Sequence, residues 1–221
     1  MGKITLLDVT NKPISAIGKR AGICWGTNIE DETKNYKRGL DCIKSNHGRT
    51  LEFVNIEMLI DGYSARVIRE WYTHIGGSPT RLQASTRYID YSNFVYILPK
   101  GLDRIQEDKY IEAYMNIQNN YRELLDLGVT KEDAANILPL GMTTRLVDKR
   151  NLRNLIDMSK QRLCNRAYWE YRELFKDICN ELKQVDDEWE WIVENCFKPK
   201  CIAADGEIKC PESRPCGKMK K

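Results

Sequence analysis

Nine consecutive residues, T-R-L-Q-A-S-T-R-Y at positions 80–88, concentrate polar side chains directly after the Gly76-Gly77 pair. Arg87 can contact a phosphate with two N–H groups at once, and Ser85 can add a hydroxyl hydrogen bond. Gln83 can offer both a donor and an acceptor to an amide-like edge. The stretch therefore suits a site that holds a phosphate and recognises a planar base. A polar strand-to-turn segment with solvated arginines is the alternative interpretation.

A second set of polar side chains falls in residues 151–163, whose pattern predicts a helix: Asn151, Arg153, Asp157 and Arg162. Arg153 and Asp157 are four residues apart and therefore share a helix face. Their simplest interpretation is a surface salt bridge, worth about 0.3 kcal/mol.

Half of the eight cysteines lie near the C-terminus, in the pattern Cys196-x4-Cys201-x8-Cys210-x5-Cys216. Proline and Asp-Gly residues between them indicate short loops. Four thiolates on short loops suit a tetrahedral structural zinc site, here a zinc knuckle. Free thiols, disulfides and an iron–sulfur cluster remain alternatives.

The composition limits the class of protein. The 221 residues predict one domain over 1–190 and a cysteine-rich tail over 191–221. A net charge of +3 does not indicate a partner such as polymeric nucleic acid. No apolar run is long enough for a membrane span, and the N-terminus lacks a signal-peptide pattern, so we expect a cytoplasmic protein. With only His47 and His74, a catalytic zinc site built on several histidines is excluded.

Periodicity predicts an α+β fold that positions these residues, with strands and helices distributed along the chain. The expected strands are 4–9, 51–60, 91–98 and 143–150. The expected helices are 30–43, 63–72, 103–127, 151–163 and 166–182, and Thr130 is expected to cap a short helix.

Several motifs in collinear order between Ala21 and Phe175 resemble those of flavin-dependent thymidylate synthases. Ser85-Thr86-Arg87-Tyr88 matches the family pattern S-x-R-Y. The helix beginning at Asn151 matches N-x-R-x-L, and the residues that follow match L-R…A-Q-x-E-I-R. The matching segments are Ala21–Trp25, Ser45–Phe53, Ser85–Tyr88, Ile137–Leu140, Asn151–Leu155, Gln161–Leu163 and Ala167–Arg172.

The resemblance implies an antiparallel or mixed sheet with flanking helices, in a homotetramer whose subunits share active sites. It implies FAD, methylenetetrahydrofolate as one-carbon donor, NADPH as reductant and dUMP as the nucleotide that becomes dTMP. In that family no protein nucleophile attacks the base, and reduced flavin supplies the hydride. A related enzyme that leaves a hydroxymethyl group, or a non-catalytic nucleotide-binding homologue, is the alternative.

The resemblance also implies roles for individual residues. Arg162 is expected to polarise the pyrimidine carbonyl, and Ser85 is the second expected catalytic residue. Nucleotide binding is expected from Gln83, Ser85, Arg87, Arg81 and Arg162, and flavin binding from His74, Asn151, Arg153 and Asp157. Thr73-His74-Ile75 stands where the family has R-H-R, so two arginines are replaced, and Arg81 is a candidate substitute for the lost charge.

Overall fold

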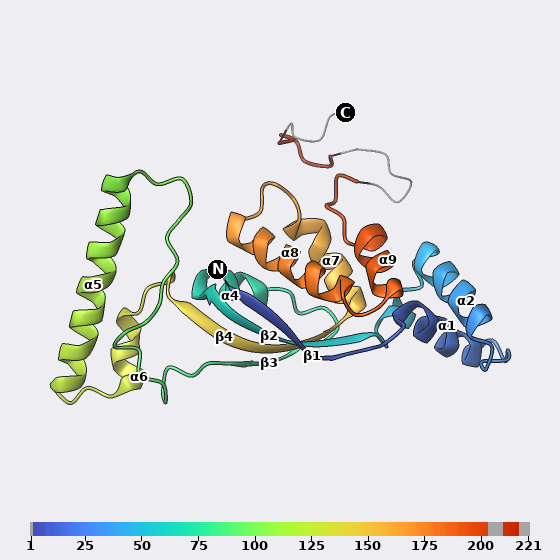
Figure 1. Cartoon of the computed structure of the whole chain (residues 1–221), viewed down its shortest axis with the longest axis horizontal. Helices are drawn as coiled ribbons and strands as arrows, with labels where there is room; N and C mark the ends of the chain where they lie inside the picture. Colours follow the sequence, from blue (N-terminus) through green and yellow to red (C-terminus); the bar gives the residue numbers. More distant parts are fainter. Residues whose placement is uncertain (1, 203–209, 217–221) are drawn as a thin grey trace. The chain divides into compact units, whose positions relative to one another are not determined.

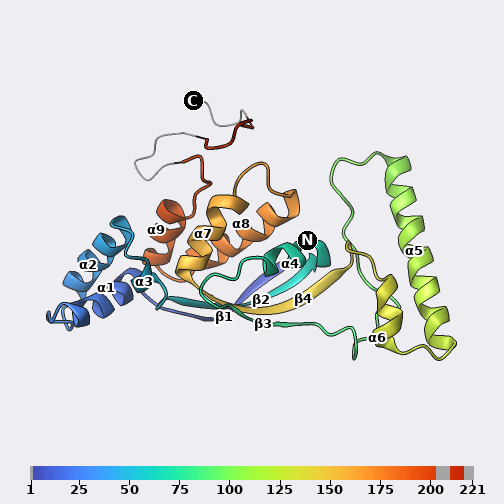
Figure 2. The ribbon, with the colours of Figure 1, turned by 180° about the vertical axis from the view of Figure 1, so that it is seen from behind.

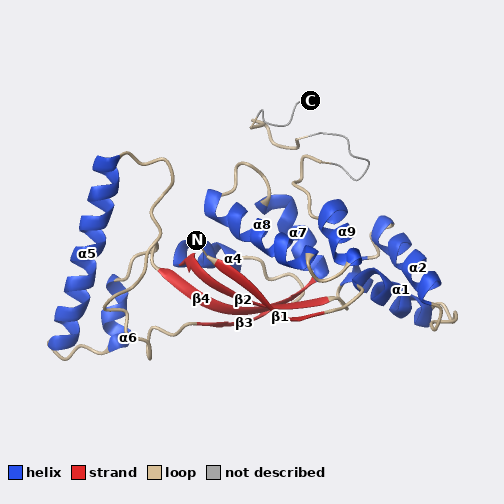
Figure 3. Cartoon of the chain, viewed as in Figure 1, coloured by secondary structure: helices blue, strands red, loops and turns tan. Residues whose placement is uncertain are grey.

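The computed structural model describes residues 2–202 and 210–216, and it has a mixed α+β architecture (Figure 1). Its strands are β1 (Lys3–Val9), β2 (Asn55–Ser64), β3 (Thr80–Gln83) and β4 (Thr143–Asn151). They form a four-stranded antiparallel sheet in the order β1-β2-β4-β3 (Figure 3). The expected α+β fold is confirmed.

The helices are α1 (Pro13–Cys24), α2 (Glu32–Lys44), α3 (Gly48–Leu51), α4 (Ala65–Tyr72), α5 (Arg104–Asp126), α6 (Lys131–Ala134), α7 (Leu152–Arg162), α8 (Trp169–Lys183) and α9 (Asp187–Cys196), with a 3-10 turn η1 (Ala135–Ile137). Two of the helices that the sequence predicts, α5 and α7, begin with side chains that cap them. Asp103 and Gln106 form a reciprocal capping box at α5, and the Asn151 side chain accepts from Asn154 N at α7. None of the described helices is long and apolar enough to cross a membrane.

Two sequence predictions were wrong in detail. The predicted strand 51–60 begins only at Asn55, because α3 occupies the residues up to Leu51. The predicted strand 91–98, all of it described, contains only an isolated bridge from Tyr96 to Met142. The helices α1 and α9 were not predicted.

The chain divides into two compact units. Unit 1 contains Met1–Lys3, Ile60–Thr73 and Leu82–Val147, and unit 2 contains Ile4–Leu59, His74–Arg81 and Asp148–Lys221. The described part of the cysteine-rich tail belongs to unit 2, and α9 runs across the expected boundary between residues 190 and 191. A separate tail domain over 191–221 stays a prediction.

In unit 2, α8 contacts both α7 and α9, and the three helices lie side by side in both views of the ribbon (Figures 1 and 2). Leu155 and Met158 of α7 and Leu174 and Ile178 of α8 are fully buried. Their spacing of three to four residues gives each helix one apolar face, and burial of that face stabilises each large side chain by about 1.5–3 kcal/mol. Packing therefore fixes α7, which carries four of the expected site residues or their caps.

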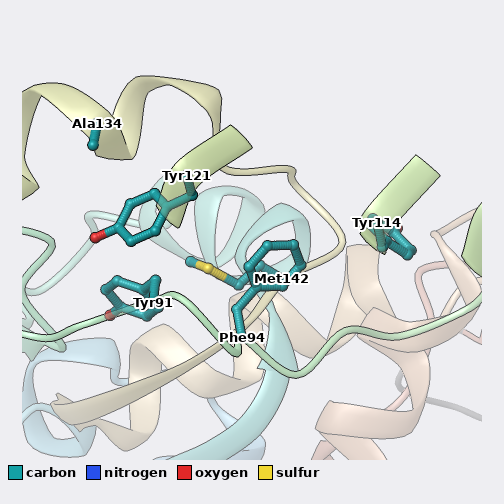
Figure 4. Packing of buried hydrophobic residues seen from close by; sticks show 6 residues of the cluster. All are labelled: Tyr91, Phe94, Tyr114, Tyr121, Ala134 and Met142. Atoms are coloured by element: carbon teal, nitrogen blue, oxygen red, sulfur yellow. The ribbon is translucent and has the colours of Figure 1, made fainter. Parts of the chain in front are cut away.

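In unit 1, a cluster of buried side chains joins the loop after residue 90 to α5 and α6 (Figure 4). It contains Tyr91, Phe94, Tyr114, Tyr121, Ala134 and Met142. Tyr114 stacks on Tyr96 with ring centroids 4.2 Å apart. In place of a regular strand, this aromatic packing and two backbone hydrogen bonds hold residues 91–98: Ile97 N donates to Gly141 O, and Thr143 N donates to Val95 O.

Candidate active site

Arg162, the last residue of α7, lies between His74 and Tyr171 in unit 2. Its Nε donates a hydrogen bond of 2.8 Å to His74 Nε2. Its guanidinium carbon lies 4.5 Å from the centroid of the Tyr171 ring, within the range of a cation–π contact. Tyr171, from the first turn of α8, is fully buried and also meets the His74 ring edge-on at 6.3 Å. The plane and direction of the Arg162 side chain are thus held from two sides.

His74 is a neutral imidazole in this arrangement. Its Nε2 accepts the hydrogen bond from Arg162, so the ring proton lies on Nδ1. Burial, followed by the positive charges of Arg162 and Arg150, lowers the pKa of His74 to about 4. At neutral pH His74 therefore orients the arginine without adding a second positive charge.

A buried ion pair lies at the junction of β4 and α7. Arg150 Nε and Nη2 donate to the two carboxylate oxygens of Asp148 at 2.5 and 2.8 Å, and both side chains are fully buried. Arg150 Nη1 also donates to Asn154 Oδ1 at 2.5 Å. Proteins tolerate buried charges when the ion pair is bidentate and the other donors of the arginine also have hydrogen-bond partners. Through the hydrogen bond to Asn154, the ion pair holds the first turn of α7 in place.

The glycine turn at Gly76-Gly77 packs against the same helix end. Gly77 has φ +74°, and a Cβ at this position would clash with the side chain of Asn151. A Cβ at Gly76 would lie 3.2 Å from Asn154 Nδ2. Asn151 is buried and its oxygen caps α7, accepting from Asn154 N at 2.9 Å. The turn needs glycine both for its backbone conformation and for this close approach.

Arg153 and Asp157 each form an ion pair with another residue, in place of the salt bridge between them that helix geometry suggests. Arg153 Nη1 donates to Glu52 Oε1 at 2.7 Å, and Lys160 Nζ donates to Asp157 Oδ1 at 2.8 Å. A Cβ on Gly48 would come within 3.0 Å of the Arg153 guanidinium. The structure thereby joins two matched motifs, Ser45–Phe53 and Asn151–Leu155.

Three of the residues expected to bind the nucleotide, Gln83, Ser85 and Arg87, lie in unit 1, at the end of β3 and directly after it. Gln83 Nε2 donates to Thr144 Oγ1 at 3.3 Å, and Ala84 N donates to Arg145 O at 2.8 Å, which attaches this segment to β4. Ser85 Oγ accepts from Arg87 N at 3.1 Å, forming a tight local turn. Arg87 Nε pairs with Glu132 Oε2 at 3.1 Å, with both side chains about 60% exposed.

The structure therefore gathers the expected residues in two places. His74, Asn151, Arg153 and Arg162 lie around α7 in unit 2, as does Asp157, whose side chain is 61% exposed. Gln83, Ser85 and Arg87 belong to unit 1, and Arg81 of β3 belongs to unit 2. Sequence reasoning gave no role to Glu52, Asp148, Arg150 or Tyr171. Glu52 and Tyr171 lie inside motifs that match the family, so the resemblance could have identified both as candidate site residues.

The four cysteines expected to bind a metal do not share one location. Cys201, Cys210 and Cys216 line a cavity of about 130 Å³ in unit 2 together with Cys164, whereas Cys196 lines another cavity with Ile156 and Trp191. Among residues 2–202 and 210–216, no three His, Cys, Asp or Glu side chains already stand together as metal ligands.

Residues 5–186 match the family described as "Thymidylate synthase complementing protein". The chain is also similar to curated proteins named "Flavin-dependent thymidylate synthase". The one from Clostridium tetani (strain Massachusetts / E88) is 27% identical, over 98% of this chain and 93% of its own length. The one from Pyrococcus furiosus is 29% identical, over 100% of this chain and 95% of its own length. The one from Sulfolobus acidocaldarius is 30% identical, over 81% of this chain and 67% of its own length.

Proposed function

The chain belongs to the thymidylate synthase complementing protein family and is an enzyme of that family, and we propose that it transfers a one-carbon unit from methylenetetrahydrofolate to C5 of dUMP, giving dTMP. FAD is the redox cofactor and NADPH the reductant. The observation that carries the proposal is the fixed guanidinium of Arg162, held by His74 and Tyr171 at the end of the motif helix α7.

Arg162 binds a pyrimidine carbonyl and stabilises the negative charge that develops on its oxygen. Its Nε is committed to His74, and its planar terminal nitrogens keep a fixed direction because the group stacks on Tyr171. Donors that are oriented before the reaction stabilise developing charge without having to reorganise. Lysine cannot replace this role, since its single ammonium lacks the planar fork.

Arg87 binds the phosphate of the nucleotide, with Ser85 beside it and Gln83 at the base edge. Its present ion pair with Glu132 is exposed, so it contributes at most about 1 kcal/mol. A charge-assisted bond to phosphate contributes about 1.5–3 kcal/mol. Because the contact with phosphate contributes more free energy than the ion pair, we expect the nucleotide phosphate to replace the Glu132 carboxylate at Arg87. Arg81 supplies a second cation nearby in sequence.

The residues around α7 fit a flavin by the chemistry of their donors. The half-exposed Arg153 gives one N–H to Glu52 and retains others that suit the acceptor edges and phosphates of the cofactor. Asn151 and Asp157 flank it, and His74 lies at the other end of the helix. When bound, FAD supplies the hydride that completes the methyl group. None of the residues assigned here is a cysteine nucleophile.

We assign a homotetramer with active sites shared between subunits, in the cytoplasm. Large apolar side chains beside the nucleotide-binding residues support association, because Leu82 is 74% exposed and Tyr88 75% exposed. None of the eight cysteines, all of which lie in the described residues, forms a disulfide, which supports a reducing compartment.

The purified protein tests the proposal in two steps. Its visible absorption spectrum, with and without added FAD, should show oxidised flavin. Incubation with dUMP, methylenetetrahydrofolate and NADPH should then give a product with the mass of dTMP. A product heavier by one oxygen atom would instead identify the hydroxymethylating enzyme. Nucleotide binding without flavin and without product would overturn the enzymatic proposal in favour of a nucleotide-binding homologue.

A further inference from the structure

Four thiols from two distant parts of the chain line one small cavity in unit 2. Cys164 lies in the loop between α7 and α8, and Cys201, Cys210 and Cys216 come from the C-terminal segment. The cavity has a volume of about 130 Å³. The pKa of the Cys201 thiol is raised first by burial and then by Cys164, Cys210 and Cys216, so each of these three lies within electrostatic reach of Cys201.

The C-terminal segment is attached to α7, to α8 and to the loop between them. Lys200 N donates to Lys160 O at 2.8 Å, and Phe197 packs edge-on against Phe175 at 5.7 Å. Arg166, in the loop between α7 and α8, donates from Nη1 to Glu212 Oε2 at 3.1 Å and to Arg214 O at 3.2 Å. The cysteines are therefore brought together by contacts that do not themselves involve sulfur.

We propose that Cys164, Cys201, Cys210 and Cys216 together bind one Zn²⁺ as a structural site. Four thiolates complete a tetrahedral shell, which leaves no open position for substrate and requires no histidine. The sulfurs now surround the cavity instead of converging as metal ligands. With Zn–S distances of about 2.3 Å, binding draws them inward. Residues 210–216 contain no helix or strand, so their backbone can close without breaking a regular element.

The surrounding charges suit an anionic zinc–thiolate centre. Four thiolates and one Zn²⁺ carry a net charge of −2, and an anion of this kind is stabilised by nearby cations. Lys200 and Arg166 both line the cavity, and both are linked to Glu212. The two cations outnumber the one carboxylate, so these three side chains together carry a net positive charge beside the cavity.

The composition of this site differs from the four C-terminal cysteines that spacing alone suggests. Cys196 ends α9 and lies in a separate cavity of about 470 Å³. Burial raises the pKa of its thiol to about 11, so it remains a neutral apolar side chain. Cys196 therefore provides a matched control for Cys164.

The site also has a mechanical consequence. Cys164 follows Arg162 by two residues, so a metal bound there anchors the loop directly after the end of α7. The metal site itself does not depend on the proposed enzymatic function.

The test measures zinc per chain in protein purified under reducing conditions, by native mass spectrometry and elemental analysis. We expect one Zn²⁺ per chain in the wild type and in Cys196→Ser, and at least ~100-fold weaker binding in Cys164→Ser. X-ray absorption on the wild type should find four sulfur neighbours at about 2.3 Å. When Cys164→Ser does not fold, the same measurement on Cys196→Ser decides the question, because four sulfur neighbours in that variant exclude Cys196 as a ligand.

Two results would overturn the inference. One is wild-type protein without zinc after incubation with excess zinc. The other is retention of zinc by Cys164→Ser together with its loss from Cys196→Ser. Because both readouts are metal content, failure of the metal site is distinguishable from failure of the enzymatic proposal, which is measured by flavin binding and product mass.

Discussion

Arg162 Nε donates to His74 Nε2 across 2.8 Å, although the two residues are 88 positions apart in the sequence. The bond can exist only while Nε2 is unprotonated. It therefore couples the orientation of the proposed catalytic arginine to the protonation state of one histidine, whose pKa burial and two arginines lower to about 4.

This coupling predicts a pH-dependent stability. In the unfolded chain the pKa of His74 returns to about 6.5, so between pH 6.5 and 4 the unfolded state binds a proton that the folded state does not. The free energy of unfolding should fall as the pH is lowered through this window. We expect a loss on the order of 2 kcal/mol, after allowance for the solvent that reaches this half-buried ring. Urea unfolding at a series of pH values measures it.

His74→Gln is the matched variant, because a glutamine oxygen can accept from Arg162 but does not titrate. The stability difference between wild type and variant should change across pH 6.5 to 4 and be constant above pH 7. Nitrogen-15 NMR of the wild type should also find Nδ1 protonated and Nε2 bare. Equal pH profiles for the two proteins would contradict the buried neutral histidine.

Arg162→Lys should separate binding from turnover. The lysine ammonium keeps one positive charge but loses both the bond to His74 and the planar stack on Tyr171. We expect kcat to fall by about 10²–10³, the cost of losing one preorganised donor, with a smaller change in KM. Arg104→Lys, at the exposed first residue of α5, is the control and should leave both constants unchanged. Unaltered kcat in Arg162→Lys would remove Arg162 from the catalytic role.

Arg87→Ala should weaken dUMP binding by about 1.5–3 kcal/mol, the contribution of a charge-assisted hydrogen bond. Isothermal titration with dUMP measures the change. Glu132→Gln is an informative partner, since it removes the carboxylate that now pairs with Arg87 and leaves the arginine in place. We expect Glu132→Gln to bind dUMP at least as tightly as the wild type. If it lost affinity as Arg87→Ala does, the ion pair and not a phosphate contact would explain Arg87.

Local chemistry made part of the molecule predictable from sequence. Apolar periodicity located α5 and α7, and most residues of the donor-rich stretch 80–88 are exposed in the structure. The helix α1 escaped prediction because it begins at Pro13 after Lys12 in a left-handed conformation, φ 46°, and no side chain caps it. The usual start signal was absent.

Long-range contacts were the part that sequence spacing could not supply. Spacing grouped Cys196 with the tail cysteines because it is their nearest neighbour in the chain, yet α9 buries it elsewhere and the α7–α8 loop contributes Cys164. Asp148 and Arg150 were interpreted as part of an ordinary strand. Two charges placed at i and i+2 project to the same face of a strand, and only the tertiary structure shows that this face is fully buried.

Asp148→Asn should destabilise the protein strongly. The substitution leaves the fully buried Arg150 guanidinium without its counter-charge, and breaking one partner of a buried pair typically costs about 3–5 kcal/mol. Urea unfolding at pH 7 measures the loss. The double variant Asp148→Leu with Arg150→Met should recover much of that stability, because no charge remains buried. Comparable losses in the single and double variants would show that shape, and not charge pairing, dominates at this position.

Ile75→Arg should strengthen flavin binding. Ile75 stands where the family pattern has the second arginine of R-H-R, and its side chain is 70% exposed, so the substitution removes little packing. An added charge-assisted bond to the anionic cofactor is worth about 1.5–3 kcal/mol, which corresponds to a 10- to 100-fold lower Kd for FAD. Fluorescence quenching on titration of FAD measures Kd. Ile75→Gln adds polarity without charge and should bind as the wild type does. Equal affinities in all three proteins would place the cofactor phosphates away from residue 75, and the positive charge they require would then have to come from Arg153 or Arg81.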